Sequence, residues 1–206
     1  MKLEKLQKRI IQLRPWGHEI LLPYDLVTAR PPYTKETYPG EKNIKEYTLW
    51  PKFVYLTESG AFEGLSPPAK VIDLGCSSGW FSIYFAQQGY RVVAIDKSLK
   101  AIEQVKFVKG IYQLNNLSVL RGDISTLRWG FDNFDLILML GLIHHLDEED
   151  QHLVPKWCYE ALKVGGVIVV ETKPEIPCQE LLEYAGFTVK RLKLKKGRAA
   201  WRGDRK

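Results

Sequence analysis

The chain has 206 residues, which is enough for one domain with a modest extension and too few for a second full domain. Hydrophobic residues make up 45% and charged residues 26%, as in ordinary globular proteins. No apolar run has membrane-spanning length, and residues 1–14 intersperse Lys and Arg instead of forming a leader, so we expect a cytoplasmic protein. The net charge of +6 and the pI of about 9.1 are compatible with a polyanionic partner such as RNA, and equally with a solvated basic surface.

Residues 1–50 are expected to form an extension, and residues 51–206 the main domain. Met1–Leu13 carries apolar residues at three-and-four spacing, which predicts an amphipathic helix. Prolines interrupt residues 14–46, where His18–Leu22 favours a short strand. The mixture of aromatic and basic side chains there suits either a cover over the domain or an RNA-facing surface. A further helix is expected from about Tyr47 to Ser59.

The stretch from Lys70 to Ser98 organises the rest of the chain, because it reads as strand, glycine turn, helix and strand. An apolar strand leads into Asp73, and small residues follow over 75–79, where the chain turns sharply. A helix over Trp80–Gln88 is expected to place three aromatic side chains on the sheet. These are Phe81, Tyr84 and Phe85. Gly89 suits the position just past the helix, and the strand Arg91–Ile95 then ends at Asp96.

The glycine turn does not match the pyrophosphate fingerprint G-x-G-x-x-G, because Gly75 and Gly79 are four apart with Ser77 between them. Asp73 would lie beneath a bound ligand, where its negative charge repels phosphate and attracts a cation. Asp96 has the spacing of an acid that binds a ribose hydroxyl. A positively charged nucleoside ligand is therefore favoured, with an ordinary α/β turn or a degraded dinucleotide site as alternatives.

A helix is expected over Leu99–Leu114, capped by Ser98. Its buried side chains are expected to be Ile102, Val105, Phe107 and Val108. Ser118–Arg121 reads as the next strand, and the sequence Gly-Asp-Ile follows it at residues 122–124. Phe134–Met139 is a continuous apolar run of the kind found in buried parallel strands.

The end of a central strand in an open α/β sheet is where ligands bind, and residues 140–146 follow such a strand. An acidic run then suits the first turn of a helix that reaches Leu162. Residues 163–166, Lys-Val-Gly-Gly, predict a turn before the strand Val167–Glu171. A helix over Cys178–Tyr184, ended by Gly186, precedes a terminal antiparallel hairpin. Its strands are expected at Phe187–Leu194 and Arg198–Trp201, around a turn at Lys195–Gly197.

These motifs, in this order, resemble the class I, Rossmann-like S-adenosylmethionine-dependent methyltransferases, whose first motif commonly reads D-x-G-x-x-x-G. The resemblance covers residues 51–201 and departs in one place, because Ser77 stands where a glycine is often found. It implies a seven-stranded, mostly parallel α/β sheet with a C-terminal antiparallel hairpin. It also implies S-adenosylmethionine as the cofactor of a transferase. The implied cofactor-binding residues are Asp73, Gly75, Cys76, Ser78, Gly79 and Trp80 around the turn, Asp96 and Lys97 at the ribose, Asp123 and Ile124 at the adenine, and Leu140 and Gly141 on the methyl side.

His144 and His145 are the candidate catalytic residues, since they follow the central strand close to the methyl donor. A base is needed only when the acceptor must lose a proton. The alternative is that the histidines pack beneath the cofactor, as in many members of this class. We expect no metal there, because no Cys or carboxylate set at ligand spacing completes a site. The three cysteines, Cys76, Cys158 and Cys178, are far apart in the sequence and form no Cys-x-x-Cys pair. We therefore expect neither a structural zinc site nor a disulfide.

The acceptor is expected to be RNA, specifically tRNA, contacted through the basic N-terminal segment and the basic tail from Lys190 to Lys206. A weaker resemblance of residues 139–146 and 169–174 to methyltransferase-like enzymes that modify the tRNA wobble uridine agrees with this expectation. Methylation of a small hydroxyl- or carboxyl-bearing metabolite is the first alternative. A non-catalytic module that binds the cofactor or RNA is the second.

Overall fold

The computed structural model describes residues 49–126, 133–192 and 199–206. The chain divides into two units, residues 1–54 and 55–206, and the second unit carries the sheet. Helix α4 (Leu49–Glu58) falls within the segment where a helix was expected. The helix expected at Met1–Leu13, the strand at His18–Leu22 and the turn at Lys195–Gly197 lie outside the described residues. The domain boundary near residue 50 stays a prediction.

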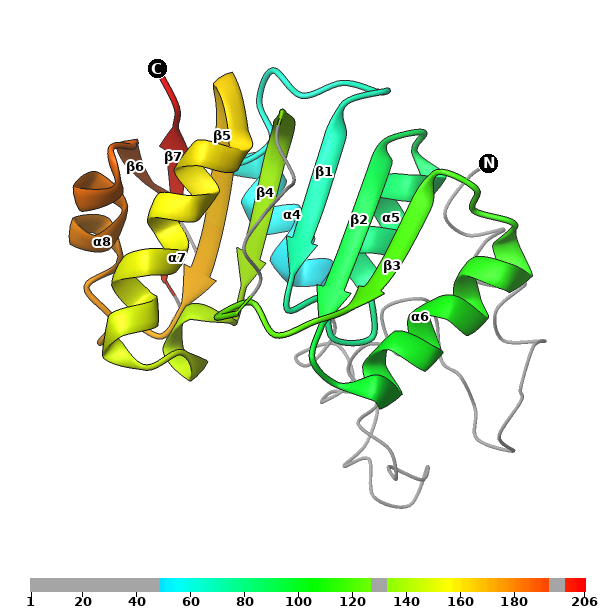
Figure 1. The fold of residues 1–206 in the computed structure, drawn as a ribbon. Coiled ribbons are helices and arrows are strands. Elements are labelled where there is room, and N and C mark those ends of the chain that lie inside the picture. Colours follow the sequence, from blue (N-terminus) through cyan, green and yellow to red (C-terminus); the bar gives the residue numbers. More distant parts are fainter. Residues whose placement is uncertain (1–48, 127–132, 193–198) are drawn as a thin grey trace, which may run out of the picture. The chain divides into compact units, whose positions relative to one another are not determined.

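The described part of the second unit forms one seven-stranded sheet with the order β3-β2-β1-β4-β5-β7-β6 (Figure 1). Strands β1 to β5 pair in parallel, whereas β7 pairs antiparallel with both β5 and β6. This is the mostly parallel sheet with antiparallel C-terminal strands that the sequence predicted. The strand bounds are β1 Lys70–Leu74, β2 Arg91–Asp96, β3 Leu117–Arg121, β4 Phe134–Leu140, β5 Leu162–Thr172, β6 Thr188–Leu192 and β7 Ala199–Asp204.

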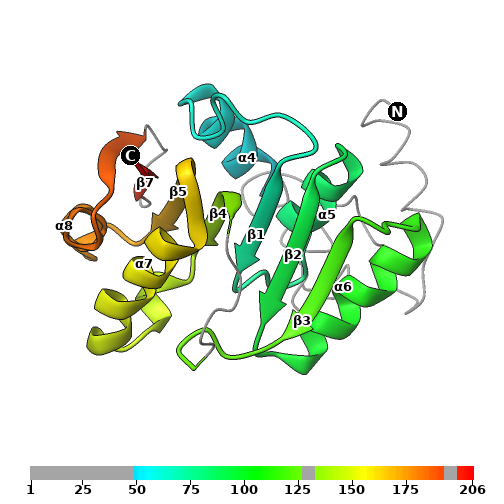
Figure 2. The same cartoon turned by 45° about the horizontal axis from the view of Figure 1, so that its top comes forward.

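Helices cover both faces of this sheet, as the parallel strands require. Helix α5 lies on one face, and α7 and α8 lie on the other (Figures 1 and 2).

The starts of two helices are capped as their sequences suggest. Ser98 Oγ accepts a hydrogen bond from the Ala101 N–H at 3.3 Å, and Asp147 Oδ1 accepts one from the Asp150 N–H at 2.9 Å. The helix bounds are α5 Trp80–Gln87, α6 Leu99–Tyr112, α7 Glu148–Ala161 and α8 Cys178–Ala185.

The main core fills the space between the sheet and helices α7 and α8. Alternate residues of the central strands face it, among them Ile72 of β1, Ile137 of β4 and Ile168 of β5, all fully buried. Because side chains alternate along a strand, Asp73 and its neighbours in register face the opposite side, where α5 lies. The topology thus leaves the carboxyl ends of β1 to β4 as the edge that holds the candidate site.

Three local expectations need correction. Phe107 is 41% exposed instead of buried, because it lies about 200° around α6 from Val105, whose face packs on the sheet. Residues 163–166 do not form a separate turn, because β5 begins at Leu162 directly after α7, with an irregular register opposite Phe134. The segment after β4 contains a short 3-10 helix, η1 (Ile143–His145), that the sequence did not predict.

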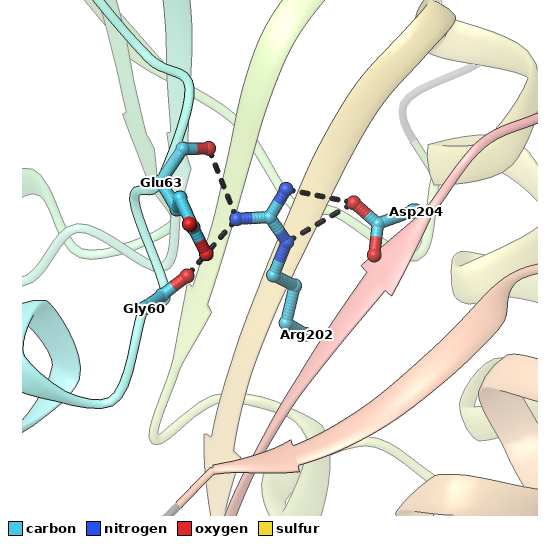
Figure 3. Close-up of polar contacts among 4 residues, drawn as sticks. All are labelled: Gly60, Glu63, Arg202 and Asp204. Atoms are coloured by element: carbon cyan, nitrogen blue, oxygen red, sulfur yellow. Dashed lines mark hydrogen bonds and ion pairs between the residues drawn. The ribbon is translucent and has the colours of Figure 1, made fainter.

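Arg202 of β7 fixes the loop that follows α4 (Figure 3). Its Nη1 donates to the carbonyl oxygens of Gly60 and Glu63 at 2.9 and 3.0 Å. The other nitrogens, Nε and Nη2, donate to Asp204 Oδ1 at 3.0 and 2.8 Å. The planar guanidinium thereby satisfies two loop carbonyls while its charge is balanced by a carboxylate.

Candidate functional site

The turn between β1 and α5 is held in an unusual backbone conformation. Gly75, Ser77 and Gly79 all have positive φ, at +66°, +51° and +78°. A Cβ at Gly79 would stand 2.5 Å from Val105 Cγ2, and one at Gly75 would stand 2.9 Å from Leu142 Cδ1. The positive φ favours glycine at both positions, and at Gly79 the close packing of Val105 also excludes a side chain. Ser77, in place of the family's middle glycine, adopts the left-handed region despite its side chain.

Asp96, the last residue of β2, holds this turn by its carboxylate. Oδ2 accepts a hydrogen bond from the Ser77 N–H and Oδ1 accepts one from the Ser98 N–H, both at 2.8 Å. The Asp96 carbonyl oxygen also accepts the Gly122 N–H at 3.1 Å, which ties in the chain after β3. Each carboxylate oxygen retains a second acceptor direction, so the group can still bind a ligand hydroxyl.

Asp73 lies in β1, one residue before the strand ends, and is only 4% exposed. Ser82 Oγ of α5 donates to its Oδ2 at 2.5 Å, so the buried carboxylate has a hydroxyl partner. Cys76 in the neighbouring turn feels this charge. Burial is the largest cause of the raised pKa of its thiol, and the negative charges of Asp73 and Asp96 raise the pKa further. Two carboxylates thus give the turn a negative potential, which fits a cationic ligand and opposes a phosphate.

The expected cofactor residues Cys76, Ser78 and Trp80 have buried side chains. Cys76 Sγ donates to the Ser77 carbonyl oxygen at 3.6 Å. The Trp80 ring stacks on Tyr84 at 5.5 Å between centroids and meets Phe81 edge-on. Their side chains therefore pack inside the domain, and the turn presents its backbone to a ligand.

The residues expected at the adenine follow β3. Asp123 is exposed, and its Oδ1 accepts hydrogen bonds from the Ser125 hydroxyl at 2.9 Å and the Ser125 N–H at 3.1 Å. These two bonds, in that order, lower the pKa of the carboxyl, and the positive charge of Lys97 lowers it further. Ile124 is 5% exposed and joins the main core. Lys97 has an exposed side chain, and its carbonyl oxygen accepts Arg121 Nε at 3.2 Å.

The two histidines lie in the segment that follows β4. Gly141 has φ of +77°, and its N–H donates to the Glu171 carbonyl oxygen at 2.7 Å, so the chain leaves the sheet sharply. Half-buried His144 has its Nδ1 3.0 Å from Thr172 Oγ1. The exposed His145 ring lies 4.2 Å from the His144 ring, centroid to centroid. Leu140, the last residue of β4, pairs in register with the buried Glu171.

The described structure thus brings the ends of β1, β2, β3 and β4 to one edge, with Asp73, Asp96, Asp123 and His144 at successive strand ends. Within the described ranges, no group of three or more His, Cys, Asp or Glu side chains is placed to hold a metal ion. Sequence reasoning missed Ser82, Ser125 and Thr172, which orient these groups. Ser125 follows Asp123 at the spacing of an Asx turn, a signal that could have been read. The contact between His144 and Thr172 spans 28 residues and left no local pattern.

Comparison with known proteins adds the decisive observation. Residues 71–166 match a family model described as a methyltransferase domain. This part of the chain is therefore similar to a methyltransferase domain. The match and the fold confirm the resemblance to the class I S-adenosylmethionine-dependent methyltransferases, and S-adenosylmethionine is the cofactor of that family. The wobble-uridine resemblance receives no such support.

Curated relatives are similar to this chain over a limited region. A carboxy-S-adenosyl-L-methionine synthase of Vibrio vulnificus (strain YJ016) is 25% identical over 114 residues, covering 53% of this chain and 46% of the relative. An uncharacterized methyltransferase of Synechocystis sp. is 28% identical over 106 residues, covering 52% and 48%. The chain therefore matches about half the length of these relatives.

Solved structures share the fold of the methyltransferase domain. A TehB-like SAM-dependent methyltransferase from Corynebacterium glutamicum superposes with a TM-score of 0.61 at 18% identity, covering 80% of this chain and 97% of the other. A SAM-dependent methyltransferase from Aquifex aeolicus superposes with a TM-score of 0.59 at 20% identity, covering 74% of this chain and 88% of the other.

In the described part of the chain, no helix is both long and apolar enough to cross a membrane.

Proposed function

We propose that this chain transfers a methyl group from S-adenosylmethionine to a nucleophilic acceptor. The observation that carries the proposal is the pair of carboxylates, Asp73 and Asp96, on either side of the turn between β1 and α5. They lie at the carboxyl ends of β1 and β2, next to the switch point between β1 and β4, where open α/β sheets bind ligands. The negative potential that they create supports an adenosyl ligand with a positive charge over a phosphorylated one.

The residues have distinct roles in this proposal. The backbone around Gly75 and Gly79, above Asp73, holds the methionine portion, and the Asp96 carboxylate accepts the ribose hydroxyls. Asp123 and Ile124 hold the adenine, while Leu140 and Gly141 line the methyl side. When bound, S-adenosylmethionine supplies a methyl carbon activated by its sulfonium. The protein then needs mainly to align the acceptor and exclude water.

His144 is the proposed general base for an acceptor that must lose a proton. Its Nε2 takes the proton while the acceptor atom bonds to the methyl carbon and the carbon–sulfur bond breaks, with the electron pair going to sulfur. General base catalysis of this kind contributes about 10²–10⁴-fold to a rate. His145 is more exposed and is the less favourably placed of the two.

RNA, specifically tRNA, is the first proposed acceptor. Residues 190–206 contain nine Lys and Arg against one Asp, and the chain as a whole carries a charge of +6. Such a segment binds phosphates without regard to sequence, so it can hold a polyanion while another surface selects the base. The aromatic and basic residues of the extension at 1–50 support the same acceptor.

A small metabolite is the second candidate, and one observation favours it. Residues 49–189 contain 17 Asp and Glu against 12 Lys and Arg. Burial first, and then the charges of Asp147, Glu149 and Asp123, raise the pKa of Asp150, so these carboxylates lie near one another beside the proposed adenine site. A negative edge of this kind repels phosphate and is better suited to a neutral or cationic acceptor.

The experiment is a transfer assay with the full chain and S-adenosylmethionine labelled in its methyl group, offered bulk tRNA or a metabolite extract. Label in tRNA supports the first acceptor, and label in a small molecule supports the second. Binding of S-adenosylmethionine without transfer would favour a non-catalytic module. Tight binding of a nicotinamide dinucleotide, with no binding of S-adenosylmethionine in calorimetry, would overturn the proposal. Mass spectrometry of ligand that co-purifies with the chain distinguishes the methyl donor from a carboxylated form.

A further inference from the structure

The hydrogen bond between His144 and Thr172 joins two elements that meet only in the folded domain. His144 belongs to η1, directly after β4, and Thr172 is the last residue of β5. The distance from Nδ1 to Oγ1 is 3.0 Å, within normal range for such a bond. Thr172 is fully buried, so its hydroxyl has a fixed environment.

Backbone hydrogen bonds hold the two segments that carry His144 and Thr172. The Gly141 N–H donates to the Glu171 carbonyl oxygen at 2.7 Å, immediately before Thr172 in β5. One turn later, the His145 N–H donates to the Leu142 carbonyl oxygen at 2.8 Å and closes η1. The first bond holds the end of β4 against the end of β5 beside the side-chain pair, and the second fixes the backbone of η1, which carries His144.

We propose that Thr172 is a positioning residue for His144, with the imidazole Nδ1–H donating to Thr172 Oγ1. A neutral imidazole carries one proton, so a proton held at Nδ1 leaves the basic lone pair on Nε2. This inference rests on the proposed function, in which Nε2 of His144 accepts the proton of the acceptor. The same contact restricts rotation of the ring, and so sets the direction from which Nε2 meets an acceptor.

The first test is the tautomer of His144 in the unaltered chain. ¹⁵N-histidine-labelled protein at about pH 8.5, well above the ordinary histidine pKa of about 6.5, gives separate signals for protonated and unprotonated ring nitrogens. The His144 signals are assigned by their loss in His144→Gln. We expect Nδ1 to carry the proton. A proton on Nε2 would overturn the proposal, whether or not any acceptor has been found.

The second test compares substitutions at Thr172. Thr172→Val keeps the shape and removes the hydroxyl, and Thr172→Ser keeps the hydroxyl. We expect Thr172→Val to lower kcat about 10–100-fold, with KM for S-adenosylmethionine changed less than about twofold, and Thr172→Ser to restore kcat to within about fivefold. Thr188→Val, on the exposed start of β6, is the matched control and should leave kcat unchanged.

The outcomes separate this proposal from the proposed function. Equal kcat in Thr172→Val and the unaltered chain would show that the hydroxyl has no positioning role, although methyl transfer stands. If Thr172→Val fails to fold, the nitrogen signals of the unaltered chain still decide the direction of the hydrogen bond. Absence of transfer to every acceptor, together with a proton on Nδ1, would contradict the proposed function and leave the hydrogen bond as inferred.

Discussion

The Asp96 carboxylate holds the backbone of Ser77, 19 residues earlier, by a hydrogen bond of 2.8 Å from the Ser77 N–H to Oδ2. The same carboxylate receives the Ser98 N–H through its other oxygen. One side chain at the end of β2 therefore shapes the turn after β1 and starts helix α6. The group proposed to bind the ribose is thus held in place by the protein itself, and little order has to be gained on binding.

Asp96→Asn tests this double role. The amide nitrogen of Asn would have to face one of the two backbone N–H donors, and the negative charge is lost. We expect the free energy of unfolding to fall by about 1–3 kcal/mol and S-adenosylmethionine to bind about 10–100-fold more weakly, as urea titration and calorimetry would measure. Glu103→Gln, on the exposed side of α6, is the control for loss of a carboxylate. Unchanged cofactor affinity in Asp96→Asn would contradict the assignment.

Gly79→Ala tests the packing of the turn. Its new Cβ would stand 2.5 Å from Val105 Cγ2 at a φ of +78°, so both contact and backbone oppose the change. We expect a loss of about 2–4 kcal/mol in the free energy of unfolding. Gly110→Ala is the matched control: this glycine lies within α6 with nothing within 4 Å of its added Cβ, and the change should stabilise the chain by about 0.5–1 kcal/mol. Equal stabilities of the two variants would refute the packing argument.

Ser125→Ala tests the lowered pKa of Asp123. Loss of the hydroxyl donor should raise the pKa part of the way to the ordinary value of about 3.9, because the Ser125 N–H still donates. A carboxyl whose pKa is lowered on folding stabilises the fold above its unfolded pKa, and this contribution disappears as the pH falls through the folded pKa. The contribution is small, since Asp123 is exposed. Carboxyl ¹³C titration measures the shift, with Ser118→Ala as control, and an identical Asp123 curve in both variants would contradict the prediction.

The three thiols are expected to be inert in the folded protein. Burial raises the pKa of Cys158, and it raises that of Cys178 to about 12, with a further contribution from Glu180. Cys76 is buried beside two carboxylates that oppose its ionisation. At pH 8 almost no thiolate is present, and only thiolate reacts. A disulfide reagent should therefore label none of the three before unfolding and all three afterwards. Rapid labelling of native Cys76 would indicate that the turn is not buried as described.

Much of the fold was readable in the sequence because its determinants are local. The apolar runs of β1, β2 and β4, the cap at Ser98 and the glycines after α5 and α8 each act within a few residues. The spacing from the glycine turn to Asp96 predicted a nucleoside-bearing ligand for the same reason, since one βαβ unit contains it. Phe107 shows the limit, because the side of α6 that packs on the sheet is settled by the neighbouring strands.

The sequence by itself determined the order of strands and helices, the glycine turn and the acids at the strand ends, since each follows from short-range patterns of polarity and backbone freedom. Only the tertiary structure decided which groups orient those acids and histidines: Ser82 on Asp73, the Ser77 amide on Asp96, and Thr172 on His144. These hydrogen bonds join residues 9, 19 and 28 positions apart. Such pairs come within about 3 Å only when the strands, helices and loops pack together, and a hydrogen bond requires that distance.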